Sequence, residues 1–153
     1  MKYKDKLQSL NEIDREAFVI IIDEWFDKIE RESVNNKIEY FQTYFMNTLN
    51  NPVLGSNFDE RKFFLDTLAA IPLIECDFLS HIYSQNQSVE VLNLQREGID
   101  KFAIVGVITR LKNYGFLESS GIRWTAENPL NDLVRITSFG KKFCDFCLNQ
   151  SGK

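Results

Sequence analysis

The sequence contains few of the residues that interrupt or cross-link a chain, with 3 prolines, 7 glycines and 3 cysteines among 153 residues. This scarcity, together with 44% hydrophobic residues, excludes collagen-like, low-complexity and disordered chains. An odd number of cysteines, and no apolar leader in Met1 to Leu10, predict free thiols in a reducing compartment. The cytoplasm is therefore the expected location.

Long apolar runs and catalytic signatures are also missing. The longest unbroken apolar stretch, Ala17 to Ile22, is far shorter than the roughly 20 residues of a membrane-spanning helix, so no membrane attachment is expected. His81 is the single histidine, and the sequence has no nucleophile-elbow motif to place beside it and no phosphate-binding glycine loop. We therefore expect no enzymatic activity and no cofactor.

The sequence is rich in phenylalanine, with 13 residues at mostly helical spacing that predict core positions. A first amphipathic helix is predicted to begin after an N-cap at Asn11 and to break within Ser33 to Asn36. A second runs from about Lys37 to Asn50 and ends before Pro52. Residues 1–71 are thus predicted to form N-terminal helices.

A third helix is predicted with Asp59 as its N-cap, and Pro72 then either starts a fourth helix or kinks the third. Val89 to Leu94 is ambiguous, because alternation supports a short strand only in part. A helix from Asp100 to Asn113 is predicted to end at Gly115, which suits the left-handed position after a helix.

The chain then predicts a β-hairpin and a last helix. Ile122 to Thr125 and Leu133 to Ile136 are the expected strands. Thr137 or Ser138 is the expected cap of the helix that follows. Its predicted buried stripe is Phe139, Phe143, Phe146 and Cys147.

This order of elements resembles the second half of a winged-helix domain, with residues 122–136 as the wing. The predicted fold class is mainly α: an N-terminal helical layer, 1–71, packed on a C-terminal winged-helix-like unit, 72–153, with a small β-hairpin, together one compact domain. The alternative is a helical bundle that carries a hairpin. Ser84 to Asp100 leaves room for only a short middle helix or a strand.

Winged helices commonly insert one helix into the DNA major groove. Here that helix would be Asp100 to Asn113, and the candidate nucleic-acid-binding residues are Lys101, Arg110, Lys112, Arg123, Lys141 and Lys142. After Gln95 the chain holds nine bases and six acids, so the region is only weakly basic. DNA-binding regulation is therefore the alternative, and a non-enzymatic interaction or regulatory protein is the first hypothesis.

Cysteine spacing suggests a second type of site. Cys144 and Cys147 have the spacing of a zinc or redox pair, and Cys76 with His81 would complete a tetrahedral set. The pair falls within a predicted helix, whereas zinc-binding pairs usually lie on a turn. Buried, unreactive cysteines without a metal are the preferred interpretation.

The first helix has an apolar stripe wider than one neighbouring helix usually covers, which predicts self-association. The residues expected at such a homodimer contact are Phe18, Ile22, Trp25 and Phe26. The alternative is that the other helices cover this stripe entirely.

Four segments of the chain together resemble the bacterial Abi-alpha family, which is associated with abortive phage infection. They are Lys37 to Phe41, Asp59 to Leu65, Gly115 to Leu117 and Arg135 to Phe143. The resemblance covers about Asn11 to Leu148. It implies a bacterial or prophage-borne protein that acts through binding in phage defence or regulation, and it implies no catalytic residue.

Overall fold

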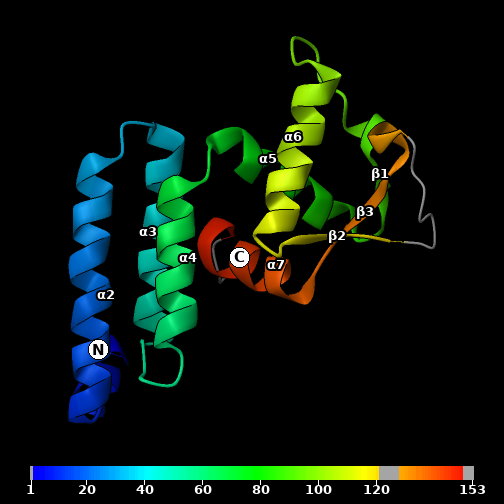
Figure 1. Ribbon diagram of the computed structural model, residues 1–153. Coiled ribbons are helices and arrows are strands. Elements are labelled where there is room, and N and C mark those ends of the chain that lie inside the picture. Colours follow the sequence, from blue (N-terminus) through cyan, green and yellow to red (C-terminus); the bar gives the residue numbers. More distant parts are fainter. Residues whose placement is uncertain (1, 121–127, 150–153) are drawn as a thin grey trace. The chain divides into compact units, whose positions relative to one another are not determined.

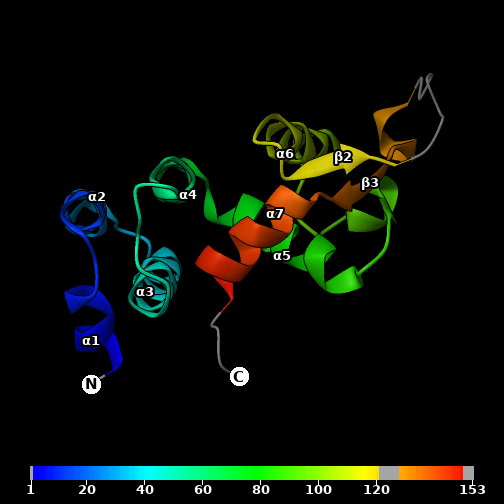
Figure 2. The ribbon, with the colours of Figure 1, turned by 90° about the horizontal axis from the view of Figure 1, so that it is seen from below.

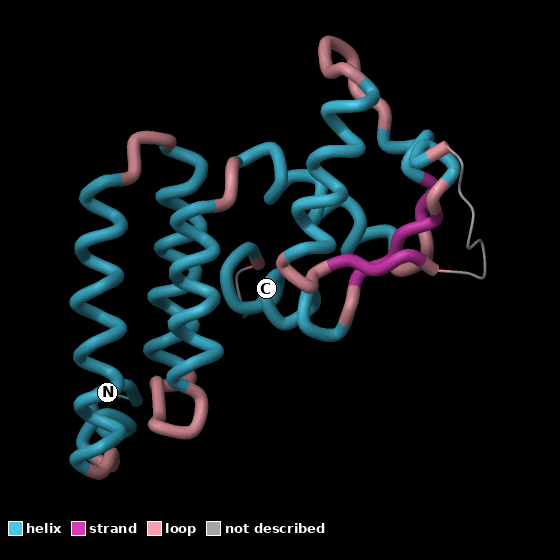
Figure 3. Tube along the Cα trace, viewed as in Figure 1, coloured by secondary structure: helices cyan, strands magenta, loops and turns pink. Residues whose placement is uncertain are grey.

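The computed structural model describes residues 2–120 and 128–149 of the chain. The described residues are mainly helical, with one small antiparallel sheet, which confirms the predicted fold class at this level (Figures 1 and 3). The chain divides into two compact units. Unit 1 contains the described residues up to Ile71 and those from Asp145 onward, and unit 2 is Pro72–Cys144.

Unit 1 is built from helices that lie side by side, and Figure 2 views α2, α3 and α4 nearly end-on. Its helices are α1 (Lys2–Gln8), α2 (Glu12–Arg31), α3 (Asn35–Asn50) and α4 (Phe58–Ala70). Trp25 anchors the α2–α3 contact: its indole N–H donates to the Phe41 carbonyl at 2.8 Å, and its ring lies 4.7 Å from that of Phe45. Ile21, Phe41, Phe64 and Leu68 are buried in this core.

The helix ends in unit 1 follow local chemistry, with one correction. Asn11 caps α2 by accepting a hydrogen bond from the Asp14 amide at 2.8 Å, as predicted. The prediction that Asp59 caps α4 is wrong, because the cap position is Asn57 and Asp59 lies in the first turn. The Asn57 side chain instead accepts from the Leu54 amide and so closes the preceding loop.

The C-terminal residues complete unit 1 rather than unit 2. The side-chain amide of Asn47 donates to the Phe146 carbonyl at 2.9 Å. The Phe146 ring lies edge-on to Tyr44, with ring centroids 5.0 Å apart, and the Arg61 guanidinium lies 3.9 Å from its centroid. Unit 2 begins after Ile71, and the residues from Asp145 onward group with the N-terminal helices.

Unit 2 has the order helix, strand, short helix, helix, strand, short helix, strand, helix. Its elements are α5 (Leu73–Gln85), β1 (Val89–Glu90), η1 (Val91–Leu94), α6 (Lys101–Asn113), β2 (Leu117–Ser119), η2 (Pro129–Asn131), β3 (Leu133–Ile136) and α7 (Ser138–Phe143). Pro72 stands at the N-cap of α5 and therefore starts a new helix. Residues 89–94 form both a strand and one turn of 3₁₀ helix, so the middle helix is truncated.

The sheet has strand order β1-β3-β2, with both pairings antiparallel. Val134 of the central strand pairs with Val89 on one side and with Ser119 on the other. Strand β3 has its predicted bounds. Its hairpin partner in the described residues is β2 rather than the predicted strand 122–125, which lies outside the described residues.

Three caps define the two ends of α6 and the start of α7. The Asp100 side chain accepts from the Phe102 amide, and Gly115 at φ 82° turns the chain after α6. The Phe116 amide then donates to the Leu111 carbonyl at 3.0 Å, which completes a Schellman motif. Thr137 caps α7 by accepting from the Gly140 amide at 2.9 Å.

The last helical segment departs from the prediction of a regular helix. After α7 the chain forms a π-helical turn, η3 (Cys144–Leu148). Phe143 and Cys147 are fully buried, as predicted, whereas Phe139 and Phe146 are only half-buried. The wider turn shifts residues out of the register of an ordinary helix, so the predicted stripe is not continuous.

Candidate functional site

The helix that the sequence analysis assigned to DNA binding, α6, presents a largely uncharged surface. We define the α6 face as the exposed Phe102, Ala103, Thr109, Arg110 and Asn113 with the half-buried Gly106. Phe102 is 59% exposed, the second-highest value among the large hydrophobic side chains found exposed in the described residues. This face therefore combines one large apolar side chain with two small residues.

Arg110 is held against its own unit. Its Nε donates to the carboxylate of Glu75, a side chain on α5 that is 0% exposed. A Cβ placed on Gly106 would lie 3.5 Å from Nη1 of Arg110, so the guanidinium folds back along the helix over Gly106. The second Glu75 oxygen, Oε2, has no hydrogen-bond partner among the residues that the structure describes. Arg110 is therefore the group that compensates the buried Glu75 charge.

Lys112, the second predicted DNA contact inside α6, is also paired. Its ammonium donates to Asp132 and, at 2.8 Å, to the Ser119 hydroxyl. Asp132 follows η2, so this contact ties α6 to the segment leading into β3. Both cations in the body of the helix thus neutralise carboxylates of unit 2.

The remaining predicted contacts are scattered. Lys101 is exposed at the start of α6, with its ammonium 5.3 Å from the centre of the Phe102 ring. Lys141 and Lys142 are exposed on α7. Arg123 lies outside the described residues. The structure therefore brings Arg110 and Lys112 onto one helix but gives each an internal carboxylate partner.

The cysteine set does not form a metal centre. Cys76, Cys144 and Cys147 are buried free thiols, whereas His81 is exposed. Within residues 2–120 and 128–149, no group of three or more histidine, cysteine, aspartate or glutamate residues is placed to hold a metal ion.

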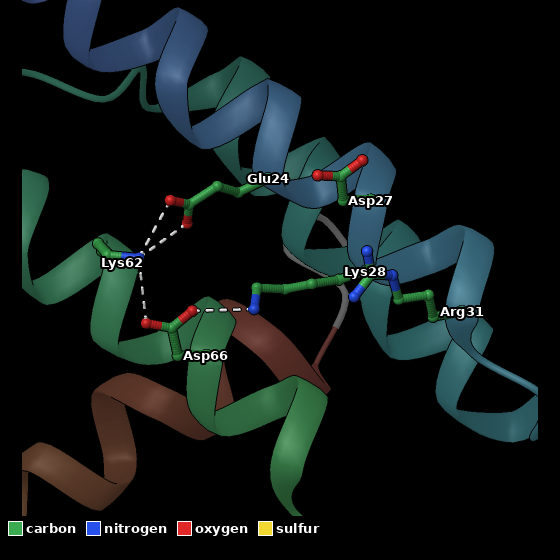
Figure 4. Close-up of a pocket in the computed structure, with 6 residues that line it drawn as sticks. All are labelled: Glu24, Asp27, Lys28, Arg31, Lys62 and Asp66. Atoms are coloured by element: carbon green, nitrogen blue, oxygen red, sulfur yellow. Dashed lines mark hydrogen bonds and ion pairs between the residues drawn. The ribbon is translucent and has the colours of Figure 1, made fainter.

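A pocket of about 250 Å³ opens between α2 and α4 in unit 1 (Figure 4). Its lining is Glu24, Asp27, Lys28, Arg31, Lys62 and Asp66. We call the four that interact, Glu24, Lys28, Lys62 and Asp66, the α2–α4 charge cluster. Lys62 donates to both Glu24 oxygens at 3.1 and 3.0 Å and lies 3.3 Å from Asp66. Lys28 lies 3.0 Å from the other Asp66 oxygen.

The pKa shifts of Lys62 and Asp66 in this cluster are those expected of paired charges. The hydrogen bond to Glu24 raises the pKa of Lys62. Burial raises the pKa of Asp66, but the hydrogen bonds from Lys28 and Lys62 outweigh burial, so the pKa of Asp66 lies below its ordinary value. Each pKa shift favours the charged form of its own group. Such groups are held ionised, which suits a clamp between two helices better than proton transfer.

Tyr44 is the described group with the largest pKa shift. Burial raises the pKa of this phenol far above its ordinary value. Its hydroxyl donates to the Arg61 carbonyl at 2.8 Å, inside the helical core of unit 1. A buried, hydrogen-bonded neutral phenol is structural, so this shift does not mark a catalytic acid.

The predicted self-association stripe on α2 is mostly covered. Trp25 is 8% exposed and packs within unit 1, which removes it from any free surface. Phe18 and Ile22 are half-buried, whereas Phe26 is 51% exposed. The sequence pattern did not single out Val19 and Ile20 as surface residues, yet they are 55% and 46% exposed.

In the comparisons with known proteins, no family model, no curated protein and no solved structure matches this chain. In the described residues no helix is both long enough and apolar enough to pass through a membrane.

Proposed function

We propose that this protein is a non-enzymatic interaction or regulatory module that binds another protein through the α6 face. The observation that carries the proposal is the internal pairing of Arg110 and Lys112, which leaves an exposed phenylalanine beside small residues as the main feature of the helix. Apolar and aromatic side chains supply most binding energy at protein interfaces, whereas phosphate contacts need available cations.

DNA-binding regulation is the second candidate, favoured by one observation. The Arg110 side chain is 53% exposed even though its Nε contacts Glu75, so part of the guanidinium is accessible to solvent. Lys101 and Lys141 are exposed as well. The region contributes few cations, so any affinity for DNA would fall steeply with salt and be weak at physiological ionic strength.

Photocrosslinking tests the protein-binding proposal. A benzoylphenylalanine at position 102, introduced in living cells, is expected to give a discrete protein adduct that the same group at position 46 does not give. Met46 is the matched control because it is 48% exposed on a helix of unit 1. Adducts of equal pattern from both positions, or adducts only with nucleic acid, would contradict the proposal.

A mobility-shift series separates the two candidates. Protein binding through α6 predicts no retardation of duplex DNA at physiological salt, and no difference between wild type and the double variant Lys101→Ala, Lys141→Ala. Salt-sensitive retardation that this double variant weakens would instead support the regulator. Both lysines are exposed, so the variant is expected to fold.

The association with phage defence rests on the Abi-alpha resemblance alone. The described geometry supports binding rather than catalysis, which is compatible with that role. The protein that crosslinks at position 102 would give the role its first direct test, since a phage-encoded partner would support it and a housekeeping partner would not.

A further inference from the structure

A second surface, on the outer side of α2, is independent of the α6 face. Val19 and Phe26 lie seven residues apart, so they share one line along the helix, and Ile20 borders the same side. They are 55%, 51% and 46% exposed. A shallow hollow of about 440 Å³ lies here, lined by Glu12, Arg15, Glu16, Val19 and Ile20. Exposed apolar side chains concentrated on one helix face suit an interaction surface.

Apart from Arg15, the charged residues named on this surface are acidic. Its acidic ridge consists of Glu12, Glu16, Asp23, Asp27 and Glu30. Successive members are three, four or seven residues apart, so they line one side of the helix. None of them forms an ion pair in the part of the chain that the structure describes. The nearby Arg15 donates to the Gln8 carbonyl at 3.1 Å and so points toward α1.

The ridge is costly for the isolated helix, because like charges three or four residues apart repel. Elsewhere α2 pairs its charges, since Glu24 and Lys28 both contact α4. The unpaired acids therefore coincide with the exposed apolar side chains. A partner with the opposite charge and a matching apolar line would relieve the repulsion and cover Val19 and Phe26 together.

We propose that the outer face of α2 binds a basic amphipathic helix of a partner protein, which packs apolar residues on Val19, Ile20 and Phe26 and places lysines or arginines against the acidic ridge. Charge selects this occupant. A second copy of the chain would bring two acidic ridges together, and nucleic acid or an anionic membrane would be repelled. A helix fits because anchors spaced by about seven residues match on both partners.

The probe is a fluorescein-labelled amphipathic peptide of about 18 residues built from leucine and lysine. The control is a labelled peptide of the same pattern in which glutamate replaces lysine. Fluorescence anisotropy with the full chain is expected to show binding of the lysine peptide that weakens with salt, and no binding of the glutamate peptide. Amide shifts in an NMR titration are expected within Glu12–Arg31 and not in α6.

Three double variants locate the site, and melting curves check their fold. Val19→Gln with Phe26→Gln should weaken binding about tenfold or more, because two apolar anchors are lost. Glu16→Gln with Asp23→Asn should weaken it severalfold and flatten the salt dependence. The matched control, Met46→Gln with Glu97→Gln, alters an exposed apolar and an exposed acidic side chain elsewhere and should leave binding unchanged.

Several results would overturn the proposal. These are equal binding of both peptides, no binding of either, affinity insensitive to the Val19 and Phe26 changes, or NMR shifts centred outside α2. A wild-type dimer in sedimentation that strengthens with salt and disappears in Phe26→Gln would assign this face to a second copy instead. Because no α6 residue is changed, failure here leaves the photocrosslinking test at position 102 unaffected.

Discussion

Each unit contains an ion-pair system, and the two differ in where the carboxylate lies. In unit 2, Glu75 is fully buried, and among the described residues its carboxylate pairs with Arg110 alone. In unit 1, the α2–α4 charge cluster shares its charges among two lysines and two acids, with side chains 26% to 46% exposed. Water stabilises the second system but not the buried carboxylate of the first. The number of ion pairs is therefore a poor guide to how much each unit depends on them.

The largest expected effect comes from removing the one partner of the buried carboxylate. Arg110→Ala should lower the free energy of unfolding by about 2–3 kcal/mol, since a buried charge loses its partner; Arg110 is 53% exposed, so water entry limits the loss. Urea denaturation measures it, with the exposed Lys141→Ala as a control expected to change stability by at most about 0.5 kcal/mol. Equal effects of the two variants would show that Arg110 contributes no more to stability than an exposed lysine of the same unit.

Replacing both partners sharpens the comparison. Glu75→Met with Arg110→Met should return the free energy of unfolding to within about 1 kcal/mol of wild type, because no charge then remains buried. The same urea titration gives the coupling between the two sites. If the double variant is less stable than Arg110→Ala, the ion pair itself stabilises unit 2. The loss in Arg110→Ala would then not come only from leaving the Glu75 charge without a partner.

The cluster in unit 1 should respond much less to the loss of its central lysine. Lys62→Ala is expected to lower the free energy of unfolding by less than about 1 kcal/mol, because the freed Glu24 carboxylate becomes hydrated and Asp66 keeps its contact with Lys28. The difference from wild type should shrink further in high salt. Thermal denaturation at two salt concentrations checks this, and a loss as large as that of Arg110→Ala would contradict it.

The smallest expected effect is the contribution of Asp66 to the loss of stability at acidic pH. The pKa of Asp66 in the folded protein lies below its ordinary value of 3.8, so its contribution to stability is complete above that pH and is lost as the pH falls through the lower, folded value. The contribution is small because the side chain is 46% exposed. Asp66→Asn should therefore have a slightly lower free energy of unfolding than wild type at neutral pH. On acidification its free energy of unfolding should fall by less than that of wild type. Identical acid profiles of variant and wild type would contradict this.

Much of the fold could be predicted because its signals are local. Asn11, Asp100, Gly115 and Thr137 each act through a hydrogen bond or backbone conformation within a few residues, and all occupy the expected helix ends. Strand β1 was ambiguous because it is two residues long and its partner Val134 is distant in sequence. Its stability comes from that pairing and not from its own pattern.

The candidate sites were less predictable for the same reason. The positions of Arg110 and Lys112 on one helix follow from their spacing, but their partners Glu75 and Asp132 lie on other elements. A glutamate in the first turn of a helix, such as Glu75 in α5, is usually solvated and stabilised by the helix dipole. Its local sequence therefore does not indicate that it is buried. Likewise, the amphipathic pattern of α2 identifies its buried side but not which outer apolar residues stay uncovered.

The placement of Phe146 in unit 1 has a consequence for synthesis of the chain. A ribosome makes the first 71 residues before any of unit 2, and domains usually fold in the order in which they emerge. Here Tyr44, Arg61 and Asn47 contact Phe146, which is synthesised after the whole of unit 2. The first unit to emerge is therefore among the last to be completed, because its contacts with Phe146 form only after unit 2 has been made.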